Sequence, residues 1–261
     1  VAGWRGKPAS AVDTLGPSDS TGAVTIPDVV GGVPVAAIAG TPRTMGTLVG
    51  ARFKAQLQTL SRRLFNRLVT GLADAGRAMS EEQIRTALST CLESVVASDP
   101  QHGLELEAIA AASEMQREEL LLIHGYGELL GFLGSAQATT RSTYVSLNAA
   151  HTDHGLPRMV LAWHLDPDLL PYVTLVHRTP SHGPASLTLT LAGLHPVAGI
   201  SATGLAVAFN ELRVDDGAPG NLITNLIAAA LTAPTRDDAL RRLHSGPRHG
   251  GGCMHLLDAD G

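Results

Sequence analysis

Histidine and cysteine are the residues here whose types most often bind metals or act as nucleophiles. The chain has 11 histidines and two cysteines; His151 and His154 flank a turn, and His249 and His255 flank Cys253. A zinc site needs three or four ligands, commonly paired at close spacing. Neither cluster has that pattern, so we expect no metal and no other cofactor. A metal-dependent hydrolase using His151 and His154 stays as an alternative.

Two glycine-rich segments are the next candidates for chemistry. Cys253 follows three glycines, and a small residue that starts a strand is a better interpretation of it than a nucleophile. Residues 217–220 lack the Lys-Ser/Thr pair of a phosphate-binding loop and the spacing of a Rossmann fingerprint. We therefore expect no nucleotide site.

Composition and charge favour a packed chain and exclude several partners. Of the 261 residues, 44% are hydrophobic and 16% are charged, which suffices for a sizeable core. The formal net charge of -5 gives no basic surface for nucleic acid or anionic lipid. No run of about 18 apolar residues is present that would span a bilayer.

The chain start and the cysteines bear on processing and setting. Residues 1–20 begin with Val1 and lack the apolar core of a signal peptide. We expect a trimmed chain, a processed precursor or a fragment. Two scattered cysteines make no disulfide scaffold and favour a reducing, cytoplasmic setting.

Helical periodicity dominates the first half of the chain. A Gly- and Pro-rich arm is expected at residues 1–32, a short strand at 35–39, and Pro42 suits a first helical turn. Apolar residues then recur every three or four positions, and core packing explains them better than a coiled coil. Their positions are Val49, Phe53, Leu57, Leu60, Leu64, Leu68 and Leu72. A capping box at residues 80–83 opens a second helix. Two more helices are expected at residues 104–112 and 117–133.

Strand-forming segments dominate the second half. Short runs of β-branched and aromatic residues alternate with Gly, Pro, His and Asp. We expect strands at residues 143–147, 158–163, 172–177, 186–191, 205–209 and 254–257. Helical patterns return at residues 221–232 and 236–244. Helices, then strands, then helices favour an α+β fold over a doubly wound one.

Three elements of the sequence form an ordered set. Residues 40–46 read Gly-Thr-Pro-Arg-Thr-Met-Gly, residues 162–166 read Ala-Trp-His-Leu-Asp, and residues 199–212 join spaced glycines to a strand pattern and Asn210. In this order they resemble the isopenicillin N acyltransferase-like family of N-terminal-nucleophile hydrolases, which is related to the choloylglycine hydrolases. The resemblance covers roughly residues 35–261. Glycines at a close helix crossing would explain the first element equally well.

The resemblance implies three site residues. Ser142 stands where the family has its nucleophile, freed by cleavage of the preceding bond. Asp166 would orient the new ammonium and the attacking oxygen, and Asn210 would donate its side-chain amide to the oxyanion. A serine hydroxyl needs an adjacent base, and an α-amino group with a pKa of about 8 suits that role. One oxyanion donor is typically worth about 3–4 kcal/mol of transition-state stabilisation.

Each of these residues also has a structural interpretation. Ser142 at a strand start suits a solvated side chain or a local cap. Asp166 precedes Pro167 and suits the start of a turn. Asn210 at a strand end suits a hydrogen bond to a loop backbone.

The sequence departs from the family pattern at several points. The family nucleophile is usually Cys after Gly, and here it is Ser142 after Arg141. Ser201 replaces an asparagine of the glycine-rich element. The family's second asparagine region lies past residue 261, so either the chain is a fragment or it lacks part of the oxyanion pocket.

The resemblance implies an α+β fold of a particular kind, a four-layer αββα sandwich of the N-terminal-nucleophile hydrolase type. Residues 33–141 would form a helical N-terminal portion, and residues 142–261 a strand-rich portion that bears the nucleophile. The expected function is an amidohydrolase or acyltransferase that forms an acyl-enzyme from a small-molecule amide or acyl donor. The alternative is a non-catalytic relative that binds or scaffolds. We expect no nucleic-acid or membrane partner, and a homo-oligomer or a heterodimer of self-cleaved fragments.

Overall fold

The chain is mixed α+β, with a helical N-terminal part and a mixed sheet, as the sequence predicted at this level. The computed structural model describes residues 27–133, 141–212, 219–246 and 248–259. Within these ranges the helices are α1 (Pro42–Asp74), α2 (Glu81–Ser98), α3 (Pro100–Ser113), α4 (Arg117–His124), α5 (Tyr126–Leu133), α6 (Ile223–Leu231) and α7 (Arg236–Leu243). The strands are β1 (Val29–Val30), β2 (Val33–Gly40), β3 (Arg141–Leu147), β4 (Arg158–His164), β5 (Val173–Pro180), β6 (Ser186–Leu191), β7 (Leu194–Ser201), β8 (Ala206–Leu212) and β9 (Gly251–Leu257). Short 3-10 turns are η1 (Ala149–His151) and η2 (Pro167–Tyr172).

Strand pairing gives one large sheet and one separate hairpin. The seven-stranded sheet has the order β1-β2-β5-β6-β7-β8-β9. β2 and β5 pair in parallel, and the other neighbours in this sheet are antiparallel. β3 and β4 form a two-stranded antiparallel sheet of their own. A mixed sheet of this order needs the long helical crossover between β2 and β5.

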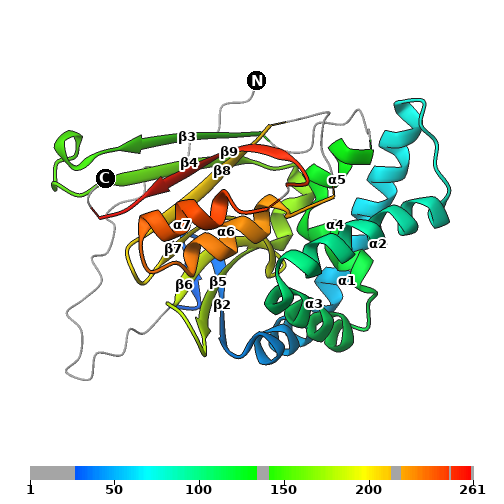
Figure 1. Ribbon diagram of the computed structural model, residues 1–261, viewed down its shortest axis with the longest axis horizontal. Helices are drawn as coiled ribbons and strands as arrows, with labels where there is room; N and C mark the ends of the chain where they lie inside the picture. Colours follow the sequence, from blue (N-terminus) through cyan, green and yellow to red (C-terminus); the bar gives the residue numbers. More distant parts are fainter. Residues whose placement is uncertain (1–26, 134–140, 213–218, 247, 260–261) are drawn as a thin grey trace.

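The register of the large sheet assigns its side chains to two faces. Thr188, Gly199 and Val207 are aligned across β6, β7 and β8, so they share one face, while Ala198 and Ala208 share the other. α6 packs closely on the first face, since a Cβ on Gly199 would lie 2.6 Å from Leu231 Cδ1. Figure 1 shows α6 and α7 on one side of β8 and β9 and the hairpin β3–β4 on the other.

The helical part is built around the apolar stripe of α1. Leu57, Leu60, Leu64, Leu68 and Leu72 are all buried in one cluster with residues of α2, α4 and α5. The interpretation of this stripe as core packing is confirmed. In the described residues no helix combines the length and apolarity needed to cross a membrane.

A buried carboxylate links the helical part to the strand-rich part. The oxygens of Glu128 in α5 accept the backbone N–H of Ile223, each at 3.0 Å. Ile223 is the first residue of α6, where a helix leaves N–H groups without internal partners and favours negative charge. Glu128 thus fixes the start of α6.

Helix boundaries differ from the predictions in two places. The single helix expected at residues 117–133 is two helices, because the chain bends at Gly125, where a Cβ would lie 2.7 Å from Leu222 Cδ2. α3 starts at Pro100, before the expected 104, because Asp99 accepts the N–H groups of Gln101 and His102 as its cap. The capping box at Ser80 is confirmed.

One strand was not predicted from the sequence, and others are longer than predicted. β7 was not expected as a separate strand, because Pro196 and Gly199 disfavour a strand interior. β9 starts at Gly251 through two glycines, ahead of the expected residue 254. Of the arm expected at residues 1–32, residues 29–30 form β1, and residues 1–26 lie outside the described part.

The glycines of the first resemblance element lie at a helix crossing. Cβ atoms on Gly46 and Gly50 would meet the α3 backbone, at the carbonyl oxygens of Glu105 and Ile109; for Gly50 the separation is 2.6 Å. α1 and α3 therefore approach each other closely because these positions carry no side chain. This close approach supports the explanation of these glycines by helix packing, which was the alternative to the family resemblance.

Gly50→Ala should destabilise the protein through this crossing. Alanine gains about 1 kcal/mol of helix propensity, but overpacking against a backbone oxygen typically costs about 1–3 kcal/mol. Taking the middle of that range, we expect a net loss of about 1 kcal/mol in the free energy of unfolding, measured by chemical denaturation. Thr47→Ala on the exposed side of α1 is the control, with a change within about 0.5 kcal/mol. An unchanged or raised stability of Gly50→Ala would contradict the close packing.

Candidate functional site

Ser142 is the second residue of β3 and faces the large sheet. In the hairpin it pairs with Trp163 of β4, and half-buried residues alternate with exposed ones along β4 and at residues 142–145 of β3. Tyr144 and Leu161 lie on the same face as Ser142. The hairpin therefore turns one half-buried face, which includes Ser142, toward the sheet.

Asn210, in the large sheet, accepts a hydrogen bond from the hydroxyl of Ser142 in the hairpin. Ser142 Oγ donates a hydrogen bond of 2.7 Å to Asn210 Oδ1, although the two residues are 68 positions apart. Asn210 is in β8 on the face opposite α6. In a second contact nearby, the rings of Tyr144 and His255 lie against each other at a tilt. These two contacts dock the hairpin on β8 and β9.

The Ser142–Asn210 contact orients the hydroxyl and does not activate it. A carboxamide oxygen accepts a hydrogen bond but is far too weakly basic to remove the serine proton. The amide nitrogen of Asn210 keeps its two N–H donors for other partners. Activation therefore requires a base that the side chain of Asn210 does not provide.

Asp166 is placed at the end of β4, where it binds an arginine. Asp166 Oδ2 accepts from Arg67 Nη1 at 2.7 Å, and Arg67 Nη2 donates to Asp168 Oδ1 at 2.7 Å. Burial alone would lower the pKa of Arg67, but Asp168 and Asp166 outweigh it, and the pKa is raised. Asp166 itself is 53% exposed. Among the hydrogen bonds of the described residues, none joins Asp166 to Ser142.

Of the three predicted site residues, the structure thus joins two. Ser142 and Asn210 are in direct contact, and Asp166 follows β4, the strand that pairs with Ser142. Arg67 was not singled out from the sequence. It lies 99 positions from Asp166 in a regular helix, and nothing in its local pattern marks it as a partner.

A buried cysteine–histidine pair was also not anticipated. Cys91 Sγ lies 3.8 Å from His249 Nε2, and His249 is only 1% exposed. Burial raises the pKa of the Cys91 thiol to about 11 and lowers the pKa of His249 to about 4. Both groups are therefore neutral near pH 7, and the thiolate needed for nucleophilic chemistry is disfavoured.

The remaining histidine and cysteine candidates are dispersed. His151 Nδ1 is 2.6 Å from Asn148 Oδ1, and His249 and His255 contact Cys91 and Tyr144 rather than Cys253. Cys253 is exposed in β9. Within the part of the chain that the structure describes, no three His, Cys, Asp or Glu side chains are grouped as metal ligands.

Comparison with known proteins adds no relative. No protein-family model and no curated protein matches the chain. The family resemblance therefore rests on the three sequence elements alone.

The buried His249 should make stability depend on pH. The unfolded chain binds a proton on His249 below about pH 6.5, whereas the folded chain does so only below about pH 4. Stability should therefore fall as the pH drops from about 6.5 to about 4, by about 3 kcal/mol from this residue. Chemical denaturation of wild type and His249→Phe at a series of pH values measures it.

In that experiment His249→Phe should show a shallower loss of stability toward acid. Some slope should remain, because burial also lowers the pKa of His102 and His255. His154→Phe, at an exposed position, serves as the control and should follow wild type. Equal slopes in wild type and His249→Phe would show that His249 does not carry the effect.

Proposed function

We propose that this protein is an N-terminal-nucleophile amidohydrolase or acyltransferase in which Ser142, exposed by breakage of the Arg141–Ser142 peptide bond, attacks an amide or acyl carbonyl. The observation that carries the proposal is the 2.7 Å hydrogen bond from Ser142 Oγ to Asn210 Oδ1. The resemblance selects these two positions from separate sequence elements, and they are in contact in the fold. The contact supports the proposal because it holds the side chain of Asn210 beside the nucleophile, where its N–H groups could reach the oxyanion of a bound substrate.

Self-cleavage would begin at the same hydroxyl. Ser142 Oγ attacks the carbonyl carbon of Arg141, the C–N bond breaks, and the acyl group moves from nitrogen to oxygen as an ester. Water then hydrolyses this ester, leaving a carboxylate on Arg141 and a free hydroxyl and α-amino group on Ser142. The new amine supplies the base that the Ser142–Asn210 contact lacks.

Turnover would use Ser142 and Asn210 in distinct roles. The α-amino group of Ser142 takes the hydroxyl proton as Oγ bonds to the substrate carbonyl carbon. The N–H donors of Asn210 stabilise the oxyanion, and the leaving amine departs with the proton. Water or an amine then attacks the acyl-enzyme, which gives hydrolysis or acyl transfer.

The hairpin register supports a role for Asp166 near the new ammonium. Arg141 pairs with His164 and Ser142 with Trp163, so the Arg141–Ser142 peptide bond lies beside the last two residues of β4. Asp166 is two positions past His164. With Arg67 holding one carboxylate oxygen, Asp166 is a suitable group to orient the ammonium of Ser142.

The four-layer αββα sandwich is part of this proposal. Helices, the large sheet and the hairpin follow one another in the order that such a sandwich requires. A fourth, helical layer would cover the outer face of the hairpin. Apolar side chains on that face support this arrangement, since Val145 is 52% and Val160 is 61% exposed.

One observation favours a second candidate, a non-catalytic protein with this fold. In the intact chain the hydroxyl of Ser142 contacts a carboxamide, and the carboxylate of Asp166 is bound to Arg67. A binding or structural protein would keep these contacts unchanged. Whether the chain is cut before Ser142 separates the two functions.

Intact-mass measurement of the purified, denatured protein tests self-cleavage. We expect two fragments, the second beginning with Ser142, and a single uncut chain for Ser142→Ala. Ser146→Ala, an exposed serine of the same strand, is the matched control and should be cut like wild type. An uncut wild-type chain would overturn the enzyme proposal and favour the non-catalytic protein. Cleavage of Ser142→Ala at the same bond would exclude Ser142 as its nucleophile.

Asn210→Ala tests the oxyanion role in the cleaved enzyme. The p-nitroanilide of an apolar carboxylic acid serves as the substrate, and release of p-nitroaniline is followed. Loss of one oxyanion donor should lower kcat by about 10²–10³ with a smaller effect on KM. Asn148→Ala, which removes an exposed asparagine, should leave kcat unchanged. A wild-type kcat in a folded, cleaved Asn210→Ala would assign the oxyanion contact to another group.

A further inference from the structure

A cavity lies on the face of the large sheet that α6 covers. It has a volume of about 570 Å³ and is lined by the sheet, the first turn of α1, one side of α3 and the C-terminal half of α6. Its floor includes Thr188, which shares a face with Gly199 and Val207. Asn210 projects from the opposite face. The cavity is therefore separate from the site at Ser142.

The size and walls of this cavity suit a small organic molecule. Ligand sites typically measure about 300–1,000 Å³ and combine mostly apolar walls with a few polar groups. The apolar walls here include Met45, Ile109, Leu194 and Leu231. Ala228 of α6 lines the cavity and is itself solvent-exposed, so it marks the mouth.

Two hydroxyl groups of the floor donate to backbone carbonyl oxygens of β5. Thr190 Oγ1 donates to the carbonyl oxygen of Thr174 at 2.9 Å, and Thr188 Oγ1 donates to that of Val176 at 3.3 Å. The two lining carboxylates are also engaged. Glu105 pairs with Arg178, and Asp99 caps α3.

Donors with remaining capacity line the same cavity. Arg178 uses Nη2 toward Glu105, and its Nε and Nη1 bond to no other described residue. Arg242 donates to the carbonyl oxygen of Ala229 and the hydroxyl of Thr232, and none of the ion pairs among the described residues includes it. His102 Nε2 is buried without a hydrogen-bond partner in the described part of the chain. An occupant must therefore bring an acceptor.

We propose that this cavity binds a monocarboxylate with an apolar chain. The carboxylate accepts from the free guanidinium donors of Arg178 and Arg242 and from His102, and the chain lies against Met45, Ile109 and Leu231. Planar guanidinium groups hold carboxylates through parallel N–H bonds, which a point charge cannot reproduce. Burial lowers the pKa of His102, partly offset by Glu105 and Asp99, so the ring is neutral, and in the tautomer with the proton on Nε2 it donates a hydrogen bond to the ligand.

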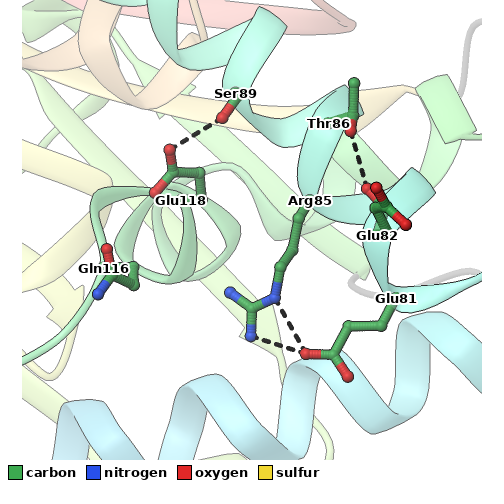
Figure 2. A pocket seen from close by; sticks show the side chains of 7 residues that line it. All are labelled: Glu81, Glu82, Arg85, Thr86, Ser89, Gln116 and Glu118. Atoms are coloured by element: carbon green, nitrogen blue, oxygen red, sulfur yellow. Dashed lines mark hydrogen bonds and ion pairs between the residues drawn. The ribbon is translucent and has the colours of Figure 1, made fainter.

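A groove between α2 and the start of α4 offers a contrast. Figure 2 shows the guanidinium of Arg85 directed at Glu81 and the hydroxyl of Ser89 directed at Glu118. The Ser89–Glu118 bond is 2.9 Å long. Arg85 and Ser89 of this groove are thus each paired with a carboxylate, unlike the donors with remaining capacity around the cavity.

Calorimetric titration of the full chain with octanoate tests the carboxylate site. We expect one octanoate per chain, and binding of octan-1-ol at least about tenfold weaker because it lacks the charge that Arg178 recognises. Ala228→Trp should block the mouth and abolish binding, whereas Ala111→Trp, on an exposed helical position outside the cavity, should bind like wild type. Arg178→Lys keeps a cation beside Glu105 and should weaken binding about tenfold through loss of the planar fork.

Three results would overturn the inference. These are the absence of octanoate binding to wild type, unchanged binding in Ala228→Trp, and equal affinity for octanoate and octan-1-ol. Ser142→Ala should bind octanoate like wild type. The outcome is thus independent of self-cleavage and of the function proposed for Ser142.

Discussion

The buried carboxylate of Glu128 is the constraint on which the arrangement of this protein depends. A helix N-terminus inside a protein needs acceptors for its first N–H groups, and Glu128 supplies both oxygens to Ile223. This fixes where α6 begins, and α6 in turn packs on Gly199 of β7. β7 pairs with β8, the strand that carries Asn210. A contact made in the helical part therefore sets the geometry of the candidate site in the strand-rich part.

The two faces of the large sheet divide its chemistry. On the face of Asn210, the hydroxyl of Ser142 donates a hydrogen bond to the carboxamide oxygen of Asn210. On the face of Thr188, guanidinium donors and a neutral imidazole surround an enclosed apolar volume. Alternation of side chains along a strand makes such a division unavoidable, because neighbouring residues must point to opposite faces.

Local features of the structure could be predicted from the sequence. The stripe of leucines in α1 and the capping box at Ser80 depend on spacings of three or four residues, and both are confirmed. β7 escaped prediction because Pro196 and Gly199 are poor strand residues that tertiary pairing tolerates. The close approach of Leu222 to Gly125 joins residues far apart in the sequence, so a helical pattern cannot reveal it.

The candidate site was only partly within reach of the sequence. A resemblance of short elements suggested that Ser142 and Asn210 share a site, but their contact requires the docking of the hairpin on β8. The partner of Asp166 is an arginine in the middle of a long regular helix. The cavity near Arg178 is assembled from several helices and strands, and no segment of the sequence contains enough of it to be recognised.

The parallel pairing of β2 with β5 has a consequence for synthesis on the ribosome. β2 ends at Gly40, and β5 begins at Val173, after all the helices from α1 to α5. During synthesis β2 therefore emerges long before β5, its parallel partner. The helices, whose contacts are closer in sequence, can assemble in the meantime. We expect the helical part to form first, with β2 at its edge and not yet paired with β5. The sheet then grows from that strand as the second half of the chain emerges.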